Sequence, residues 1–471
     1  MIWLKTDLPE FSNDLAEVIR AFRGAVEISP DGGEEVFVHR HGVENRRWVE
    51  ICEADGCSVR WEADMVLGGL AEKRMLKRAV KTACFLLMRQ IMGKAPLWGS
   101  LTGIRPTRVL REIMAEGFEG AAAEEEICRR FYVEQNKAKL LSRIVEAQEG
   151  RLETAKDEYD VYIGIPFCVT RCTYCAFAAD VLGDGKMTEP YLQALLRELR
   201  QGADIVKGMK PRAVYIGGGT PTALNADQLA RLMEETWRLF PEAKEFTVEA
   251  GRPDTITVEK LKAISTASRI SVNPQTFSDE TLRKIGRAHT AQDTLRGYEM
   301  ARNAGFRDIN MDLIAALPGE TEDDFARTLD VVMGLQPESV TVHTLAVKRS
   351  SKLHEQGYEQ VPAETAEGMV DLARARLEEG GWRPYYLYRQ KYMAGNLENV
   401  GYARPGYECL YNIGNMEETA KVLAFGAGSI SKWLFPRERR IERAPNVRNV
   451  SEYIARVDEM VERKRKLIGE A

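Results

Sequence analysis

Three cysteines lie close together ahead of the middle of the chain, at a spacing that suits metal binding. Cys168, Cys172 and Cys175 follow the pattern C-x3-C-x2-C, directly after the apolar run 161–165. The chain has eight cysteines in 471 residues, so three in one short loop are poorly explained as unrelated core residues. Three thiolates can hold a 4Fe–4S cluster and leave one iron open, whereas bacterial ferredoxins use another spacing and supply every ligand from protein. The pattern therefore predicts a cluster with an open iron.

Further polar residues interrupt or follow apolar segments downstream of the cysteines. The run Gly217-Gly-Gly-Thr220-Pro-Thr222 follows one such segment, Glu249, Gln275 and Arg287 follow later ones, and Asp312 lies within another. Consecutive glycines let backbone groups approach a ligand closely, although a glycine run alone is usually just a turn. A buried carboxylate needs a partner, so each polar residue is either a structural hydrogen bonder or faces a polar ligand. Together these positions are typical of a cavity lining.

A repeated strand–loop–helix pattern from residue 159 onward would position these residues. Strands are predicted at 159–165, 213–216, 244–250, 270–274, 309–315 and 338–343. Amphipathic helices are predicted at 189–207, 225–239, 257–266, 291–305, 322–335 and 364–380. Such alternation indicates a parallel sheet with right-handed crossovers. Six units are too few for a closed eight-stranded barrel, so we predict an α/β fold, a partial (β/α)6 barrel with its chemistry at the carboxyl ends of the strands.

The barrel, expected at 151–380, has a region on either side. Residues 1–150 are predicted to form an N-terminal α+β domain whose last helix is a linker. Its hairpins are expected at 25–28 with 36–39 and at 48–52 with 57–61, and its helices at 72–92, 107–117 and 122–150. Residues 381–471 are less regular and are expected to form a short C-terminal extension that completes the substrate cavity. The basic run 463–466 in its last helix, 450–468, is expected to be solvated.

Composition limits the cell compartment and the classes of binding partner that we expect. The 66 basic and 71 acidic residues give a net charge of −5, which does not favour binding to nucleic acid or another polyanion. No apolar run approaches the roughly 18 residues of a membrane-spanning helix, and the N-terminal sequence lacks a signal peptide. We therefore predict a cytoplasmic protein with no membrane partner. Because cytoplasmic thiols stay reduced, the five remaining cysteines are expected to form no disulfide, with a Cys52–Cys57 redox pair as the alternative.

The motifs resemble those of radical S-adenosylmethionine (radical SAM) enzymes. More narrowly, the chain is similar to the oxygen-independent coproporphyrinogen III oxidases (coproporphyrinogen dehydrogenases), in their shorter Gram-positive-type branch. The resemblance covers about residues 155–445. Its motifs are Tyr162-x-x-Ile-Pro-Phe-Cys-x3-Cys-x-Tyr-Cys, Gly-Gly-Gly-Thr-Pro-Thr, Gln275-x-Phe, Asn-x-Asp312-Leu-Ile and Phe-Gly-Ala-Gly-Ser-Ile-Ser.

The resemblance implies which residues hold the cofactors. Cys168, Cys172 and Cys175 would bind the 4Fe–4S cluster, and its open iron would take the amino and carboxyl groups of S-adenosylmethionine. Arg287 can donate two parallel hydrogen bonds to a carboxylate. The positions that match family contacts to one S-adenosylmethionine, or to a second molecule, are Tyr162, Tyr174, Gly218, Gly219, Thr220, Glu249, Gln275, Arg287, Asp312, Ala346 and Ile430.

The resemblance also implies a reaction and its partners. A 5′-deoxyadenosyl radical would take hydrogen from a propionate side chain of a tetrapyrrole, and loss of CO2 and one electron would leave a vinyl group. A low-potential electron donor such as flavodoxin or ferredoxin would supply the first electron. A substrate with several carboxylates needs cations, for which the candidates by position are Lys348, Arg349, Arg389 and Lys391.

Two positions depart from the family pattern and keep alternatives open. Phe177 stands where the family's enzyme has a fourth cysteine, and Gly164 stands where it has a histidine. The haem-chaperone branch shares the phenylalanine, but its His-Asn-x-x-Tyr-Trp motif is here Tyr411-Asn412-Ile-Gly-Asn415-Met416. The hypotheses are therefore a coproporphyrinogen III decarboxylase, a haem-trafficking protein that keeps the cluster, and another radical enzyme acting on tetrapyrroles.

Overall fold

The computed structural model describes residues 1–24, 26–103, 105–175, 179–348, 351–358, 361–390, 393–435 and 440–469. These residues form two compact units, which are described separately. Unit 1 comprises Met1–Ser142 and Arg389–Leu397, and unit 2 comprises Arg143–Tyr388 and Glu398–Ala471. Three residues singled out in the sequence, Phe177, Arg349 and Lys391, lie outside the described ranges.

Unit 1 is built on a sheet whose strand order is β2-β1-β3-β4-β5. Apolar side chains of the sheet and of its first two helices form the core, among them Leu4, Leu15, Phe37 and Phe85. The elements are β1 (Ile2–Thr6), η1 (Pro9–Phe11), α1 (Ser12–Arg23), β2 (Ile28–Ser29), β3 (Glu35–Glu44), β4 (Arg47–Ala54), β5 (Cys57–Asp64), α2 (Gly69–Met92), α3 (Pro106–Ala115), α4 (Gly120–Phe131) and η4 (Ala394–Asn396). Helix α5 (Gln135–Ala147) begins in unit 1 and ends in unit 2.

The first predicted hairpin, 25–28 with 36–39, is wrong. Strands β2 and β3 do not pair with each other, because β1 lies between them and runs parallel to both. Parallel pairing joins segments that are distant in the sequence. The turn residues around Pro30 therefore do not indicate that β1 lies between β2 and β3. Strand β3 instead forms a hairpin with β4. The second predicted hairpin, 48–52 with 57–61, is confirmed as β4 and β5.

The helix predicted at 122–150 is in fact two helices. Helix α4 ends at Phe131 and is followed by Tyr132, whose φ of 57° is left-handed and whose N–H donates to the carbonyl of Cys128 at 2.8 Å. Helix α5 begins at Gln135. The apolar spacing continues across this break, since Phe131 and Val133 are both buried, and the sequence pattern therefore hides it.

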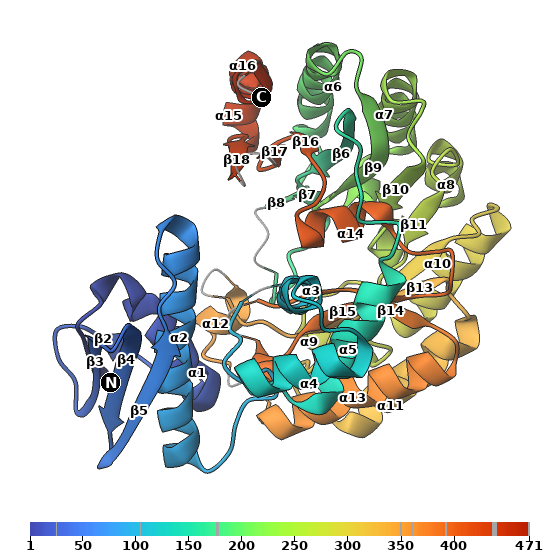
Figure 1. The fold of residues 1–471 in the computed structure, drawn as a ribbon. Coiled ribbons are helices and arrows are strands. Elements are labelled where there is room, and N and C mark those ends of the chain that lie inside the picture. The colour runs from blue at the N-terminus through green and yellow to red at the C-terminus, as the bar shows by residue number, and fades with distance from the viewer. Residues whose placement is uncertain are drawn as a thin grey trace. The chain divides into compact units, whose positions relative to one another are not determined.

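Unit 2 contains a long curved sheet with the order β14-β15-β13-β12-β11-β10-β9-β6-β16-β17-β18 (Figure 1). Its centre is a parallel run that confirms the six predicted strands. These strands are β6 (Glu158–Ile165), β9 (Lys210–Gly218), β10 (Glu245–Glu249), β11 (Arg269–Ser271), β12 (Ile309–Ala315) and β13 (Ser339–Thr344). The predicted partial α/β barrel is thus confirmed.

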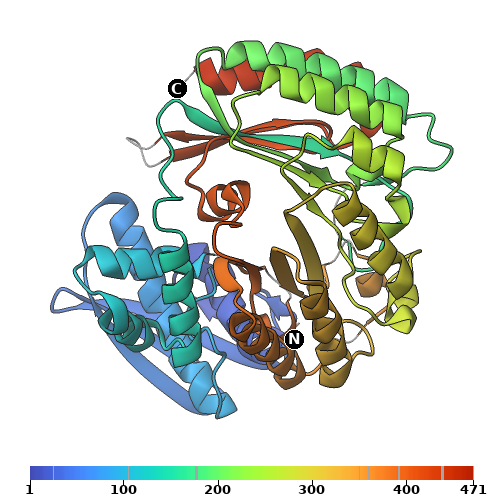
Figure 2. The same cartoon turned by 90° about the vertical axis from the view of Figure 1, so that its right-hand side faces the viewer.

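Helices between these strands cover the outer, convex face of the sheet (Figure 2). Three of them begin at capping boxes, in which Asn225, Thr290 or Thr321 exchanges hydrogen bonds with the residue three positions on, so the chain itself specifies where each helix starts. The helices are α6 (Thr188–Ile205), α7 (Ala226–Leu239), α8 (Val258–Ala263), α10 (Ala291–Asn303), α11 (Glu322–Leu335) and α13 (Ala363–Glu379). Shorter elements of the same unit are β7 (Phe167–Cys168), β8 (Asp180–Val181), η2 (Pro221–Ala223), η3 (Pro253–Thr255), α9 (Asp279–Lys284) and α12 (Lys352–Glu355).

The segment after residue 380 is more regular than predicted, because it extends the sheet at both edges. Strands β15 and β14 follow β13 at one edge, and β16, β17 and β18 follow β6 at the other. Helix α14 lies on the concave side of the sheet (Figure 2). The elements are β14 (Arg383–Tyr388), β15 (Asn399–Ala403), α14 (Leu410–Glu417), β16 (Val422–Phe425), β17 (Ile430–Phe435), β18 (Arg440–Pro445), α15 (Val450–Ala455) and α16 (Val457–Gly469).

One residue of the basic run near the C-terminus is buried, contrary to the prediction of a solvated helix end. Lys464 and Glu198 are both fully buried, with Lys464 Nζ 2.6 Å from Glu198 Oε1. Glu198 also accepts hydrogen bonds from the Tyr453 hydroxyl and the Gly426 N–H. This pair ties α16 to α6 across the edge of the barrel.

Two expectations from composition can be compared with the described residues. None of their helices is both long and apolar enough to cross a bilayer. All eight cysteines are described and none forms a disulfide, Cys52 and Cys57 included.

Candidate functional site

The carboxyl ends of the parallel strands bring the predicted site residues to one edge of the sheet. The cysteine loop follows β6, the glycine run ends β9, and Glu249 is the last residue of β10. Gln275 lies in the loop after β11 and forms an isolated parallel bridge with Leu313 of β12. The partial barrel therefore gathers, at one edge, residues that lie up to about 150 positions apart in the sequence.

The cysteine loop is anchored by backbone contacts at several points. The Thr173 N–H donates to the Ile285 carbonyl at 3.0 Å, and the Thr170 hydroxyl donates to the Gly286 carbonyl at 3.1 Å. The Cys168 carbonyl accepts from the Leu182 N–H. These contacts fix the path of the loop around Cys168 and Cys172.

The three cysteine side chains are half-buried, and neighbouring polar groups face two of them. The Thr220 hydroxyl donates to Cys168 Sγ at 3.6 Å, and a guanidinium nitrogen of Arg252 donates to Cys172 Sγ at 3.9 Å. Burial raises the pKa of the Cys168 thiol, against the effect of the Thr220 hydrogen bond. Hydrogen-bond donors at these sulfurs favour their use as thiolate ligands.

The glycine run has no room for side chains. A Cβ on Gly219 would lie 2.6 Å from the Phe167 carbonyl oxygen, and a Cβ on Gly217 would lie 2.8 Å from the carboxyl carbon of Glu249. Gly218 has a φ of +111°, a conformation that residues with a side chain rarely adopt. Glycine is therefore needed here to bring β9 close to both the cysteine loop and Glu249.

Glu249 has an unusual acidity for a carboxyl group. Burial raises the pKa of Glu249 to about 7, although the hydrogen bond from the Tyr215 hydroxyl lowers it, and the Asp312 carboxylate contributes to the rise. The Tyr215 hydroxyl lies 2.5 Å from Glu249 Oε1. Tyr215 stacks on Tyr411 of α14 with ring centroids 4.5 Å apart, and Tyr162 stacks on Tyr215 at 6.3 Å. The three tyrosines thus form one cluster of stacked rings, and Tyr215 joins this cluster to Glu249.

Gln275 and Asp312 form a second polar group at the same edge. The Gln275 N–H donates to the Asp312 carbonyl at 2.9 Å, and Gln275 has a φ of 67°. The side-chain oxygen of Gln275 is buried and has no hydrogen-bond partner within the described part of the chain. This oxygen is an acceptor and needs a hydrogen-bond donor, because an unsatisfied buried polar group is destabilising. Its position suits a bound ligand.

Asp312 is held in its ionised form. Burial would raise the pKa of Asp312, but His343 and the Asn310 amide lower it, so the net shift is downward. Asn310 Nδ2 donates to Asp312 Oδ1 at 2.7 Å, and His343 Nε2 lies 3.8 Å from Asp312 Oδ2. The other ring nitrogen of His343 lies 3.3 Å from the Tyr388 hydroxyl. An acceptor carboxylate of this kind suits hydroxyl groups of a ligand.

Arg287 and Tyr174 contact each other directly. Arg287 Nη2 donates to the Tyr174 hydroxyl at 3.1 Å, and Nη1 donates to the Gly251 carbonyl at 3.4 Å. Arg287 is 8% exposed. One nitrogen of the guanidinium thus contacts the cysteine loop, and the other contacts the segment after β10.

The remaining predicted residues are not drawn into these contacts. Ala346 lies two residues beyond β13, and Ile430, the first residue of β17, is 47% exposed. Of the candidate cations for substrate carboxylates, Lys348 is half-buried. Arg389, in unit 1, is 3% exposed and donates to the carbonyls of Leu101 and Asn396. Those contacts favour a structural role for Arg389.

Comparison with known proteins identifies the family. A model of the radical SAM superfamily matches residues 162–332. The oxygen-independent coproporphyrinogen-III oxidase-like protein HemZ of Bacillus subtilis (strain 168) is 39% identical over 415 residues, which make up 85% of this chain and 83% of HemZ. The chain belongs to this family of radical SAM proteins.

Two further proteins are similar to parts of this radical SAM protein. The heme chaperone HemW of Bacillus subtilis is 33% identical over 279 residues, or 57% of this chain and 69% of HemW. The solved structure of coproporphyrinogen III oxidase (HemN) from Escherichia coli, described as a radical SAM enzyme, matches with a TM-score of 0.53 and 24% identity. That match covers 67% of this chain and 73% of HemN, and it shows the shared fold.

Radical SAM proteins use a 4Fe–4S cluster and S-adenosylmethionine, and the residues present here fit both. Within the described ranges, no three His, Cys, Asp or Glu side chains converge as ligands of a single ion would. A 4Fe–4S cube binds each cysteine at a separate iron, so its ligands do not need to converge on one point. The crowded glycine backbone, the unpartnered Gln275 oxygen and the ionised Asp312 suit the polar groups of S-adenosylmethionine.

Several side chains that contact the predicted site residues were not among the candidates taken from the sequence. Tyr215 lies inside an apolar strand, where tyrosine is unremarkable, and only the fold shows its hydroxyl meeting Glu249. His343 was detectable, because it is a polar residue at the end of the sixth predicted strand. Arg252 also carried a signal, since it follows Glu249 by three positions at the same strand end.

Proposed function

We propose that this chain catalyses the oxygen-independent oxidative decarboxylation of two propionate groups of coproporphyrinogen III, giving the two vinyl groups of protoporphyrinogen IX. Each propionate gives up one hydrogen atom, one CO2 and one electron, and the electron passes to a one-electron acceptor. The observation that carries the proposal is the 39% identity to an oxidase-like relative over 85% of this chain. That similarity extends well beyond residues 162–332, which the superfamily shares.

The proposal assigns roles to the residues at the strand ends. Cys168, Cys172 and Cys175 would hold the cluster, which together with S-adenosylmethionine supplies the radical that takes the hydrogen atom. Glu249, Gln275 and Asp312 would bind and orient S-adenosylmethionine by accepting hydrogen bonds from its amino and hydroxyl groups. The further proposed contacts are Tyr162, Tyr174, Gly218, Gly219, Thr220, Arg287, Ala346 and Ile430.

The same proposal includes the partners. The substrate is a tetrapyrrole with several carboxylates. Lys348, which follows β13, is a candidate to bind one of these carboxylates. A low-potential donor such as flavodoxin or ferredoxin would deliver the electron that starts each cycle. The Arg287 contact can be tested directly, since Arg287→Ala should weaken S-adenosylmethionine binding or turnover, and unchanged kinetics would remove Arg287 from the site.

A second candidate is a haem carrier that keeps the cluster but decarboxylates nothing. The similarity to the heme chaperone HemW favours it. Against it stands the segment Tyr411–Met416, which lacks the His-Asn-x-x-Tyr-Trp motif of that branch. In this segment Tyr411 is buried and stacks on Tyr215, so its ring already packs within the barrel.

An anaerobic assay separates the two candidates. The cluster-loaded chain is incubated with reductant, S-adenosylmethionine and coproporphyrinogen III, and the products are identified by mass spectrometry. Formation of 5′-deoxyadenosine with protoporphyrinogen IX supports the decarboxylase, whereas tight haem binding without either product supports the carrier.

Two single cysteine variants, one in the cysteine loop and one outside it, provide the control for the assay. Cys172→Ala should abolish product formation, and Cys128→Ala, which removes a half-buried thiol of α4 in unit 1, should leave it unchanged. A Cys172→Ala variant that still forms product would refute the cluster assignment.

A further inference from the structure

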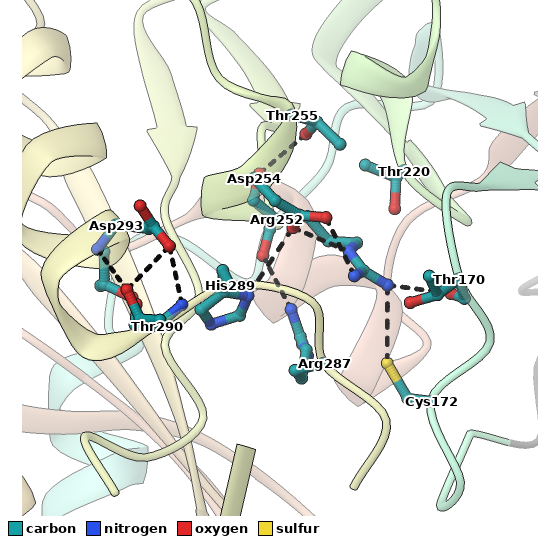
Figure 3. Close-up of polar contacts among 12 residues, drawn as sticks. Thr170, Cys172, Thr220, Arg252, Asp254, Thr255, Arg287, His289, Thr290 and Asp293 are labelled. Atoms are coloured by element: carbon teal, nitrogen blue, oxygen red, sulfur yellow. Dashed lines mark hydrogen bonds and ion pairs between the residues drawn. The ribbon is translucent and has the colours of Figure 1, made fainter. Parts of the chain in front are cut away.

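Arg252 is a buried cation beside the cysteine loop. It lies three residues beyond the end of β10 and is 4% exposed. Its Nη1 donates to the Thr170 carbonyl at 2.9 Å and to Cys172 Sγ at 3.9 Å. Figure 3 shows the guanidinium between the cysteine loop on one side and Asp254 on the other. Neither the family motifs nor the proposed reaction assigns this residue a role.

Asp254 fixes the orientation of this guanidinium. Arg252 Nε donates to Asp254 Oδ1 and Nη2 donates to Asp254 Oδ2, both at 3.1 Å. This two-point contact leaves Nη1 aimed at the loop, and a planar guanidinium held in this way cannot rotate freely. Thr255 adds a further restraint, because its hydroxyl donates to the Arg252 carbonyl at 2.7 Å.

A buried histidine supports Asp254 from behind. His289 has a fully buried side chain, and its Nδ1 lies 3.6 Å from Asp254 Oδ1 (Figure 3). Burial would raise the pKa of Asp254, but His289 and Arg252 lower it, so the carboxyl stays ionised. The result is a chain of contacts from His289 through Asp254 and Arg252 to Cys172.

A cation at a ligand sulfur affects the reduction potential of an iron–sulfur cluster. Reduction adds a negative charge to an iron–sulfur cluster and its thiolates, and hydrogen bonds to the sulfurs are among the factors that set the reduction potential. A cation that donates to a ligand sulfur stabilises the reduced form more than the oxidised form. A purely structural role, in which Arg252 only holds the Thr170 carbonyl, predicts no such effect on the potential.

We propose that Arg252 is a positioning residue that donates a charge-assisted hydrogen bond to the Cys172 thiolate and thereby raises the reduction potential of the cluster, with Asp254 fixing its orientation. The inference needs only the radical SAM cofactors. It holds equally for a decarboxylase and for a carrier that keeps the cluster, so its test is independent of the substrate.

The test measures the cluster rather than turnover. The full chain is reconstituted anaerobically, its iron and sulfide are quantified, and the midpoint potential is found by a redox titration followed by EPR. In Arg252→Gln the midpoint should become more negative. A tenfold weaker reduction equilibrium corresponds to 59 mV for a one-electron couple, and we expect a shift of this order. Arg296→Gln is the matched control, since it removes an exposed arginine that also pairs with an aspartate, Asp293.

Two further measurements keep the test decisive if Arg252→Gln binds the cluster poorly. Arg252→Lys keeps the charge but cannot form the fork, so its midpoint should fall between those of the wild type and Arg252→Gln. In wild-type protein labelled with 15N-arginine, pulsed EPR of the reduced cluster should detect a nitrogen coupling that disappears in Arg252→Lys.

Each alternative result would overturn the proposal. One is a loaded Arg252→Gln or Arg252→Lys protein with the wild-type midpoint. A second is a variant that loses iron while its remaining cluster keeps the wild-type midpoint, since that is the signature of a structural role alone. A third is a reduced wild-type cluster with no arginine nitrogen coupling.

Discussion

Replacing Tyr215 by phenylalanine should change the pH at which S-adenosylmethionine binding is lost. The Tyr215 hydroxyl donates to the Glu249 carboxyl at 2.5 Å, and burial raises the pKa of Glu249 to about 7 despite that hydrogen bond. Under the proposed function the ionised carboxylate accepts strong hydrogen bonds from S-adenosylmethionine, and the protonated carboxyl group binds it far more weakly. Binding by the wild type should therefore weaken as the pH falls through about 7.

The size of the effect follows from the strength of the lost hydrogen bond. A hydrogen bond to a charged group contributes about 1.5–3 kcal/mol, and one pKa unit corresponds to about 1.36 kcal/mol. Tyr215→Phe should therefore raise the pKa of Glu249 by about 1–2 units. At neutral pH the ionised fraction then falls from about one half to roughly 1–10%, which predicts roughly 5- to 50-fold weaker binding.

Anaerobic titration calorimetry across neutral pH measures this effect. The wild type and Tyr215→Phe should differ most at neutral pH and converge at alkaline pH, where both carboxylates are ionised. Tyr298→Phe is the matched control, because it removes a buried hydroxyl that donates to the Leu335 carbonyl on the outer helices. A loss of affinity that is equal at every pH, or an unchanged pH profile, would refute the reasoning about Glu249.

Two further predictions concern the loop and the fold. Gly219→Ala should reduce the iron and sulfide bound per chain several-fold, because its Cβ would lie 2.6 Å from the Phe167 carbonyl oxygen, whereas Gly42→Ala has open space and should bind the wild-type amount; equal metal content would contradict the crowding argument. Lys464→Met should lower the free energy of unfolding by about 3–5 kcal/mol, since it leaves Glu198 buried without its cation, and denaturant titration showing a loss below about 1 kcal/mol would contradict the importance of that pair.

Much of the barrel could be predicted from the sequence because its signals are local. Strands such as Glu158–Ile165 and Ile309–Ala315 are short apolar segments separated by helices with their own capping residues. Parallel strands joined by helices follow a fixed handedness, so the order of the elements was enough to place the cysteine loop and Glu249 at the same edge.

Errors arose where pairing joins distant segments. Nothing near Ile28 reports that the strand at Ile2 lies between it and Phe37. Likewise, the strands after residue 380 carry no local sign of which edge they extend, and they extend both. Strand pairing of this kind depends on which edges remain open once the other elements have packed.

The sequence by itself determined the cysteine spacing, the glycine run and the alternation of strands and helices, because each of these is set by residues close together in the chain. Only the tertiary structure decided which side chains act on them. Arg252 meets Cys172 from 80 positions away, and Tyr215 meets Glu249 from 34 positions away. The tertiary structure also sets the charges of the carboxyl groups. Burial raises the pKa of Glu249, whereas neighbouring side chains keep Asp254 and Asp312 ionised.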